Sequence, residues 1–136
     1  MNILLVDDEM DELQGLRIGL GVRGYEVIES LSAEQALEHL KNTRVKIGMV
    51  ITDYVLPDMN GIELVKAIRA KDQLLPIILM TGHQEKDLYA EALHSGCDGY
   101  IEKPFTLDEL MDEVEKAKRT VNIGVNFSRN NGSRAG

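Results

Sequence analysis

The chain has one cysteine, no tryptophan and no long apolar run. A single cysteine, Cys97, excludes an internal disulfide and a cysteine metal cluster, and we interpret it as a small buried residue. No apolar stretch approaches the ~20 residues that a membrane-spanning helix needs. The first residues lack a basic segment, and Asp7 and Asp8 interrupt them where a signal peptide would still be apolar. We therefore expect a cytoplasmic protein without membrane contact.

Basic residues are also scarce, with 15 Lys and Arg against 23 Asp and Glu and a formal net charge of −8. This balance argues against direct contact with nucleic acid. Residues 120–136 contain only Arg129 and Arg134 as charged residues, so residues 1–119 carry a net charge of −10. We expect one domain over residues 1–119. We expect residues 120–136 to be a disordered tail, a linker or the truncated start of an output domain.

Five short apolar runs alternate with stretches of helical spacing. The runs lie at residues 3–6, 24–29, 47–53, 74–81 and 99–102. Five successive β-α units predict an α/β fold, with a parallel doubly wound sheet and right-handed crossovers. The stretches that follow the runs place these apolar residues at helical spacing: Leu13, Leu16 and Leu20; Ala33, Ala36, Leu37 and Leu40; Ile62, Val65 and Ile68; Leu88, Tyr89, Ala92 and Leu93; Leu107, Leu110, Met111, Val114 and Ala117.

Two helix starts carry a capping signature. Ser32 is followed three residues later by Gln35, and Thr106 by Glu109, which is the spacing of a capping box. We also expect the helix after residue 81 to end at Gly96, because glycine tolerates the left-handed conformation of a helix C-cap.

The glycines at 19, 21 and 24 match the G-x-G-x-x-G pattern of dinucleotide-binding proteins. In those proteins the pattern directly follows the first strand and opens a helix, so that helix amides face a pyrophosphate. Here it comes a dozen residues after the first run and leads into the second. We interpret it as a helix C-terminus and turn, with Gly24 in the left-handed conformation.

Polar residues end or follow four of the apolar runs. They are the pair Asp7-Asp8, then Asp53, Thr81 and Lys103. In an open parallel sheet the carboxyl ends of all strands lie along one edge, where α/β proteins bind ligands. We therefore expect three carboxylates, a hydroxyl and an amine in one pocket, a combination that suits a divalent metal ion and a phosphoryl group.

The acidic residues suit a hard cation such as Mg²⁺ or Mn²⁺. We expect Asp8 and Asp53 to ligate it, Asp7 to hold a water ligand and the Val55 backbone carbonyl to complete the protein's share. Without metal, repulsion between the carboxylates raises at least one pKa. The structural alternative is that the acids after residue 6 cap the first helix, which accounts for one acid but not for the set. Separately from the metal site, the peptide bond between Lys103 and Pro104 is a candidate for the cis form, because proline lowers the cost of that form.

Over residues 2–119 the chain resembles the receiver domain of response regulators in bacterial two-component signalling, such as the chemotaxis regulators. The matching segments are Asp7-Asp8-Glu9, Asp53, Leu56-Pro57-Asp58-Met59-Asn60-Gly61, Thr81-Gly82 and Tyr100-Ile101-Glu102-Lys103-Pro104-Phe105. The resemblance implies a flavodoxin-like (βα)5 fold with strand order 2-1-3-4-5. It also implies a phosphoprotein of a phosphorelay that takes its phosphoryl group from a sensor histidine kinase or a phosphotransfer protein.

The resemblance further implies roles for individual residues. Asp53 would be the phosphoacceptor, with Mg²⁺ held by Asp7, Asp8 and Asp53. Lys103 would pair with the phosphoryl oxygens, and Thr81 would donate a hydrogen bond to one of them. Movement of Thr81 would let Tyr100 turn inward and switch the face made by the fourth helix, the fifth strand and the fifth helix. That face would bind a partner, including a second copy of the chain.

Two other functions share this pocket chemistry. A Mg²⁺-dependent phosphatase of the haloacid dehalogenase kind would use Asp53 as a turnover nucleophile, but it needs a second acid at the position that Val55 occupies. A flavin-binding module is disfavoured by the acidic first loop and the absence of tryptophan. We therefore expect a phosphoacceptor rather than an enzyme that turns over external substrates. His83, two residues after Thr81, is either a solvated loop residue or a proton donor or acceptor at the pocket mouth.

Overall fold

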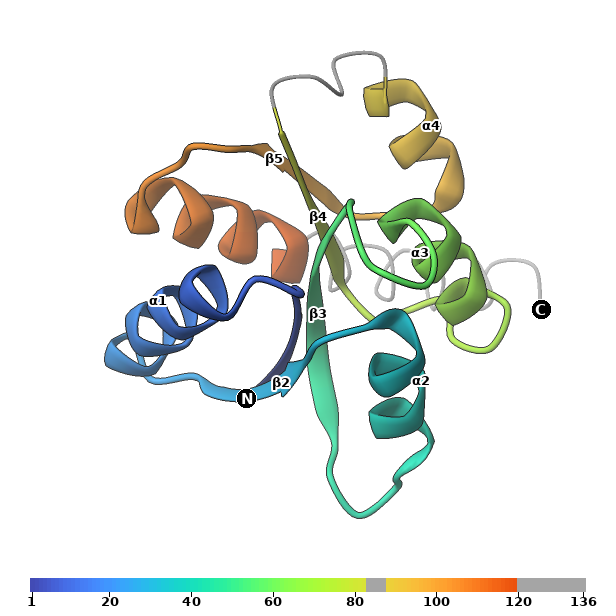
Figure 1. Cartoon of the computed structure of the whole chain (residues 1–136), viewed down its shortest axis with the longest axis horizontal. Coiled ribbons are helices and arrows are strands. Elements are labelled where there is room, and N and C mark those ends of the chain that lie inside the picture. Colours follow the sequence, from blue (N-terminus) through green and yellow to red (C-terminus); the bar gives the residue numbers. More distant parts are fainter. Residues whose placement is uncertain (83–87, 120–136) are drawn as a thin grey trace, which may run out of the picture.

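A computed structural model describes residues 1–82 and 88–119 of the chain (Figure 1). The interpretations of His83 and of the tail over residues 120–136 lie outside the described residues. The elements follow in the order β1 (Asn2–Val6), α1 (Met10–Val22), β2 (Glu26–Ser30), α2 (Ala33–Lys41), β3 (Ile47–Asp53), α3 (Gly61–Arg69), β4 (Ile77–Thr81), α4 (Leu88–Ser95) and β5 (Gly99–Glu102). Residues 107–119 form a further helix, called helix 107–119 below.

The five strands form one parallel sheet in the order β2-β1-β3-β4-β5, which confirms the predicted topology. Two strands begin later than expected. The N–H groups of Gly24 and Tyr25 donate to carbonyls of the last turn of α1, so β2 begins only at Glu26. The N–H groups of Leu74 and Leu75 donate to Asp72 Oδ1, so β4 begins at Ile77.

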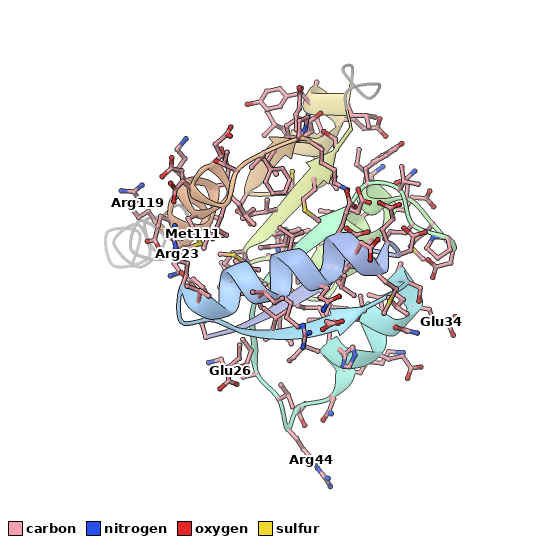
Figure 2. The ribbon with its side chains drawn as sticks, turned by 60° about the vertical axis from the view of Figure 1, so that its left-hand side comes forward. Arg23, Glu26, Glu34, Arg44, Met111 and Arg119 are labelled. Atoms are coloured by element: carbon pink, nitrogen blue, oxygen red, sulfur yellow. The ribbon has the colours of Figure 1, made fainter. Side chains whose placement is uncertain are left out.

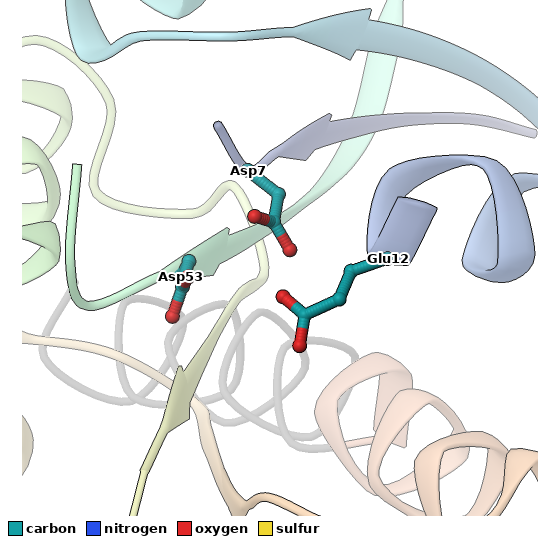
Figure 3. Close-up of side chains that lie close together, drawn as sticks. All are labelled: Asp7, Glu12 and Asp53. Carbon is teal, nitrogen blue, oxygen red and sulfur yellow. The ribbon is translucent and has the colours of Figure 1, made fainter. Parts of the chain in front are cut away.

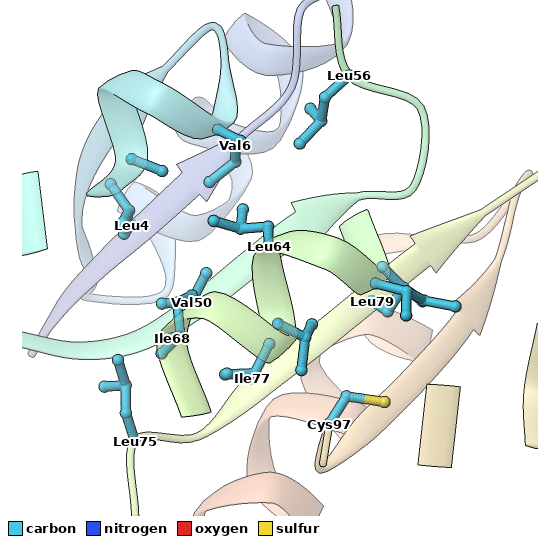
Figure 4. Packing of buried hydrophobic residues seen from close by; sticks show 14 of the residues in the cluster. Leu4, Val6, Val50, Leu56, Leu64, Ile68, Leu75, Ile77, Leu79 and Cys97 are labelled. Atoms are coloured by element: carbon cyan, nitrogen blue, oxygen red, sulfur yellow. The ribbon is translucent and has the colours of Figure 1, made fainter. Parts of the chain in front are cut away.

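Apolar cores cover both faces of the sheet. On one face, α2, α3 and α4 pack on strand residues that include Leu4, Val50 and Leu79 (Figure 4). On the other face, α1 and helix 107–119 pack on residues that include Leu5 and Ile51, and Figure 1 shows these two helices side by side. Charged residues surround the cores, and Figure 2 shows side chains such as those of Glu26, Glu34 and Arg44 pointing outward. Burial on both faces explains why the central strands are apolar at almost every position.

The predicted helical stripes are largely confirmed, with α4 as the exception. Leu13, Leu20, Ala33, Ala36, Ile62, Val65, Ile68, Ala92, Leu110, Val114 and Ala117 are all buried. In α4, however, the side chains of Tyr89 and Leu93 are 55% and 49% exposed. This short helix packs through one narrow side, so apolar spacing over eight residues overestimates its buried face. Cys97 is buried, as expected, and its thiol donates to the Ala92 carbonyl.

The glycine pattern at 19–24 lies at the end of a helix, as interpreted. Gly19 and Gly21 are within α1, and Gly24 has φ = 93° in the turn that leads to β2. A Cβ on Gly19 would come within 3.0 Å of the Leu107 side chain, so this glycine permits the close approach of α1 and helix 107–119. These glycines are therefore accounted for by helix packing and by the turn before β2, and the match to the dinucleotide-binding motif does not indicate a nucleotide site.

Side chains cap three of the helices. The predicted box at Thr106 and Glu109 is present in both directions. Ser32 accepts from Gln35 N–H as expected, but the Gln35 side chain accepts from Leu31 N–H rather than from Ser32. A further capping box, between Asn60 and Glu63 at the start of α3, was not foreseen.

Asp58, in the loop between β3 and α3, also caps α2 at long range. Its carboxylate accepts hydrogen bonds from the N–H groups of Ala33 at 3.0 Å and Glu34 at 2.8 Å. Desolvation is the largest single effect and opposes ionisation, but the backbone hydrogen bonds together outweigh it and hold the pKa of Asp58 below its ordinary value. Asp58 therefore fastens the loop that follows Asp53 to the first turn of α2.

Within residues 1–82 and 88–119, none of the helices combines the length and the apolar character that crossing a bilayer requires.

We expect Asp58→Ala to lower the free energy of unfolding at neutral pH by about 1 kcal/mol, as loss of a helix cap does. Because the folded-state pKa is depressed, this stabilisation is present above the unfolded carboxyl pKa near 4 and is lost as the pH falls through the lower folded value. Urea denaturation between pH 2.5 and 7 measures the difference between wild type and variant. Asp112→Ala, on an exposed position of helix 107–119, is the control and should show no such loss. A difference between wild type and Asp58→Ala that does not change with pH would contradict the assignment.

Candidate functional site

The four strands β1, β3, β4 and β5 bring the predicted polar residues to one edge of the sheet. Asp7 follows β1, Asp53 ends β3, Thr81 ends β4 and Lys103 follows β5. Lys103 Nζ lies 3.2 Å from Asp53 Oδ2 and 3.9 Å from Asp7 Oδ2. The expected meeting is therefore confirmed for Asp7, Asp53 and Lys103, because parallel strands end at the same edge, but Asp8, the third carboxylate expected there, lies outside the cluster.

A third acid, Glu12, belongs to this cluster and was not foreseen from the sequence. It extends from the first turn of α1, and its Oε2 lies 2.9 Å from Lys103 Nζ. Carboxylate oxygens of Asp7, Glu12 and Asp53 all lie within 4.8 Å of one another, and Figure 3 shows the three side chains converging. Glu12 is the third residue of α1, and acidic residues are common in the first turn of helices, so the sequence carried no distinctive signal for this role.

The two neighbouring acids after β1 are in different environments. Asp7 is fully buried, and its Oδ1 accepts a hydrogen bond from Glu9 N–H at 2.9 Å. Its Oδ2 has no hydrogen-bond partner among the described residues. Asp8 is exposed and is not one of the three grouped acids. The N-cap residue of α1 is Glu9, and its side chain makes no capping hydrogen bond, so the alternative interpretation of these acids as a helix cap is not met at the N-cap position.

Burial sets the protonation of the two inner carboxyl groups. Desolvation raises the pKa of Asp7 to about 7, although Lys103 and the hydrogen bond from Glu9 N–H oppose the rise. Desolvation also raises the pKa of Asp53 against the opposing charge of Lys103. The pKa of Lys103 is raised: burial works against the charged form, but Glu12, Asp53 and Asp7 together outweigh it. The expected direction of the pKa change is thus found for Asp7 and Asp53, but its main cause is burial and not the predicted repulsion between carboxylates.

The loop after Asp53 is held by backbone contacts. Tyr54 N–H donates to the Met80 carbonyl at 2.8 Å, and Gly61 N–H donates to the Tyr54 carbonyl at 2.6 Å. A Cβ on Gly61 would lie 2.5 Å from the Asp53 backbone oxygen, so only glycine fits at the start of α3. Val55, two residues after Asp53, is 57% exposed. This packing fixes the direction of the Asp53 side chain.

Thr81 and Tyr100 lie on the adjacent strands β4 and β5, on the side of β3 that faces away from β1 and Asp7. Thr81 is fully buried, and its hydroxyl has no hydrogen-bond partner among the described residues. A buried hydroxyl without a partner is unfavourable by about 1–3 kcal/mol, so an incoming acceptor oxygen would be stabilised there. Tyr100 is partly buried, and its ring packs edge-on against Tyr89 at 5.3 Å between centroids. The peptide bond between Lys103 and Pro104 is cis, as predicted.

A groove of about 540 Å³ opens beside the cluster, between α1 and the segment after β5. Its lining is formed by Asp11, Glu12, Gly15, Leu16, Gly82, Lys103, Pro104 and Phe105. Of the cluster, Glu12 and Lys103 line this groove, whereas Asp7 and Asp53 are buried and are not part of its lining.

The residues present fit a small hard cation. Three carboxylates converge, and the buried Asp7 Oδ2 has no hydrogen-bond partner among the described residues. Such oxygens are the ligands that Mg²⁺ and similar ions take. The arrangement can therefore hold a divalent metal beside a carboxylate and an ammonium group.

Comparison with known proteins gives one consistent family. The family profile described as "Response regulator receiver domain" matches residues 3–115. The transcriptional regulatory protein PrrA of Mycobacterium leprae is 32% identical over 117 residues, which cover 86% of this chain and 49% of PrrA. The C4-dicarboxylate transport transcriptional regulatory protein DctD of Pseudomonas aeruginosa is 35% identical, and the match covers 85% of this chain and 24% of DctD. The chain thus spans about half or less of the length of these curated relatives.

Solved structures agree with this result. A response regulator receiver domain protein from Clostridium thermocellum superposes with a TM-score of 0.83 at 28% identity, covering 90% of this chain and 97% of that one. A CheY-like receiver domain protein from Methanospirillum hungatei gives a TM-score of 0.82 at 27% identity, with coverages of 90% and 97%. The fold is the flavodoxin-like one of these receiver domains.

We expect Gly61→Ala to lower the free energy of unfolding by about 1–3 kcal/mol, because the added methyl group overlaps the backbone of Asp53. Gly21→Ala is the matched control: no atom lies within 4 Å of a Cβ there, so alanine in the helix should stabilise by about 0.5–1 kcal/mol. Urea denaturation of both variants decides the point. Equal effects of the two substitutions would contradict the steric argument.

We expect the stability of the metal-free protein to fall between pH 4 and 7 because of Asp7. The unfolded carboxyl loses its proton near pH 4, whereas the folded one holds it up to about pH 7. Stability is therefore full below pH 4 and declines as the pH rises through 7. Relative to Asp7→Asn, wild type should lose roughly 2–4 kcal/mol over this interval. Urea denaturation with a chelator measures both curves, and parallel curves would refute the claim.

Proposed function

This chain belongs to the response-regulator receiver family, and from that premise we propose that it is a phosphorylation-activated signalling receiver that accepts a phosphoryl group on Asp53. The observation that carries the proposal is the placement of Asp53 beside a buried acid and 3.2 Å from the Lys103 ammonium group. Its donor is a phosphohistidine on a sensor histidine kinase or a phosphotransfer protein.

Asp53 acts as the nucleophile of this transfer. A carboxylate oxygen of Asp53 attacks phosphorus, the O–P bond of an acyl phosphate forms, and the P–N bond breaks with its electron pair going to the imidazole. Such transfers depend on positioning and on electrostatic stabilisation of the phosphoryl oxygens. Lys103 supplies a positive charge next to Asp53, and the partnerless Thr81 hydroxyl supplies a hydrogen-bond donor.

We assign a Mg²⁺ or Mn²⁺ ion to Asp7, Asp8 and Asp53, with the Val55 carbonyl as a further ligand. When bound, the ion neutralises negative charge on the carboxylates and on the phosphoryl group. Asp7 and Asp53 support this assignment because their carboxylates converge, and Asp7 Oδ2 is buried and without a hydrogen bond among the described residues. Asp8 is exposed and outside the converging group, so its place among the ligands rests on the family resemblance alone.

The switch is a two-state equilibrium that the phosphoryl group biases. Phosphorylation adds acceptor oxygens and negative charge at Asp53, and Thr81 moves towards them to satisfy its hydroxyl. Tyr100, which packs edge-on against Tyr89, then turns inward and changes the face formed by α4, β5 and helix 107–119. The exposed side chains of Tyr89 and Leu93 give this face an apolar area for a partner.

That face is proposed as the output surface, with a homodimer as one of its states. The chain spans about half or less of the length of the curated relatives PrrA and DctD, and we propose no output activity for it. A net charge of −10 over residues 1–119 disfavours direct contact with nucleic acid by this domain. We propose that it works in the cytoplasm, away from the membrane. Light scattering with and without the phosphoryl group tests the dimer, and an unchanged monomer mass would refute it.

The chain is proposed to turn over no external substrate. A phosphatase that uses Asp53 as nucleophile needs an acid to protonate the leaving group, and Val55 occupies the corresponding position. The chemistry is then limited to accepting the phosphoryl group and losing it again to water. Release of inorganic phosphate from p-nitrophenyl phosphate at a catalytic rate, abolished by Asp53→Asn, would overturn this conclusion.

We expect acetyl phosphate with Mg²⁺ to add one phosphoryl group to the protein, as measured by intact-mass spectrometry. The adduct should be labile to hydroxylamine, because it is an acyl phosphate, and absent in Asp53→Asn. Asp112→Asn, which removes an acid from helix 107–119, is the control and should phosphorylate like wild type. Failure of wild type to form the adduct with Mg²⁺ would overturn the proposed function.

A further inference from the structure

Lys103 makes its shortest ion pair with Glu12 and not with the proposed phosphoacceptor. The Nζ atom lies 2.9 Å from Glu12 Oε2 and 3.2 Å from Asp53 Oδ2. The Glu12 side chain is 37% exposed, whereas that of Asp53 is 10% exposed. Glu12 therefore holds the ammonium group on the solvent side of the cluster, towards α1.

This arrangement sets up competition for one cation. A lysine ammonium group is a compact charge with three donors, and here three carboxylates surround it. A phosphoryl group on Asp53 would add negative charge and acceptor oxygens in the same place. Lys103 would then have to turn away from Glu12, or Glu12 would remain as an uncompensated charge close to the new anion.

We propose that Glu12 is a positioning residue that holds Lys103 in the unphosphorylated arrangement and thereby weakens the pocket's affinity for a phosphoryl group. The proposal rests on the proposed function of Asp53. Glu12 acts through Lys103, and it does so from the first turn of α1, where Figure 3 shows its carboxylate facing those of Asp7 and Asp53. The charge of Glu12 therefore makes phosphorylation of this receiver less favourable than it would be in the same pocket without Glu12.

The sign of the effect follows from charge. Neutralising Glu12 frees Lys103 and removes a negative charge near the incoming anion, so anion affinity rises. Because Glu12 is partly exposed, solvent screens the pair, and such pairs change an equilibrium by about three- to fivefold. If Glu12 instead served as a metal ligand, its neutralisation would weaken both metal and anion binding.

The test uses fluoroberyllate, a phosphoryl mimic, titrated into the full chain at saturating Mg²⁺. Binding is followed by NMR, using the amide of Thr81 and the ε-methylene group of Lys103. We compare Glu12→Gln with Asp11→Asn, which removes the same charge from an exposed acid of the same helix turn that forms no ion pair with Lys103 among the described residues. Thermal melting shows that both variants are folded, and a separate Mg²⁺ titration without fluoroberyllate measures the metal affinity.

We expect Glu12→Gln to bind fluoroberyllate about three- to fivefold more tightly than wild type, and Asp11→Asn to stay within about twofold. In the anion-free state of Glu12→Gln, the Lys103 signal should already lie part of the way towards its bound position. Equal affinities for the two variants, or weaker binding by Glu12→Gln, would overturn the proposal. If wild type itself binds no fluoroberyllate and forms no acyl phosphate, the proposed function of Asp53 fails instead, so the two failures are distinguishable.

Discussion

The carboxyl edge of the sheet depends on one ammonium group, that of Lys103. It forms ion pairs with Asp7, Glu12 and Asp53, and the distance from Nζ to the carboxylate oxygen is 3.9 Å or less in each pair. Carboxylates held this close repel one another strongly where water is excluded. The cation offsets part of that repulsion, yet desolvation still raises the pKa of both Asp7 and Asp53. The pocket is thus built to gain stability from any further positive charge.

The surroundings of the pocket are arranged to keep Asp53 in place. Gly61 allows α3 to begin directly against the backbone of Asp53, and the Tyr54 carbonyl accepts the first amide of that helix. Asp58 extends this rigidity by bonding two amides of α2. The loop after the proposed phosphoacceptor is therefore bonded to α2, to α3 and, through Tyr54 N–H and the Met80 carbonyl, to β4. The Thr81 hydroxyl, in contrast, is buried without a hydrogen bond among the described residues. A rigid acceptor beside an unsatisfied donor is a suitable start for a switch.

Features that depend on neighbouring residues were predictable. Alternating apolar runs and helical stripes indicated the five β-α units, and the caps at Ser32 and Thr106 were visible as residue spacings. Predictions were less accurate where a distant contact decided the outcome. Strand β4 begins three residues later than its apolar run because the amides of Leu74 and Leu75 bond to Asp72. Helix α4 exposes Tyr89 and Leu93 because it meets the rest of the domain along one narrow side.

For the candidate site, the sequence by itself determined that Asp7, Asp53, Thr81 and Lys103 would share an edge. The physical reason is that each follows a strand of one parallel sheet, and parallel strands end together. The tertiary structure alone decided which acids face the lysine. In the folded structure Asp7 is buried, Asp8 is exposed, and Glu12 of α1 lies beside Lys103. The reason is that the direction of a helix relative to the sheet depends on packing between residues that are distant in sequence.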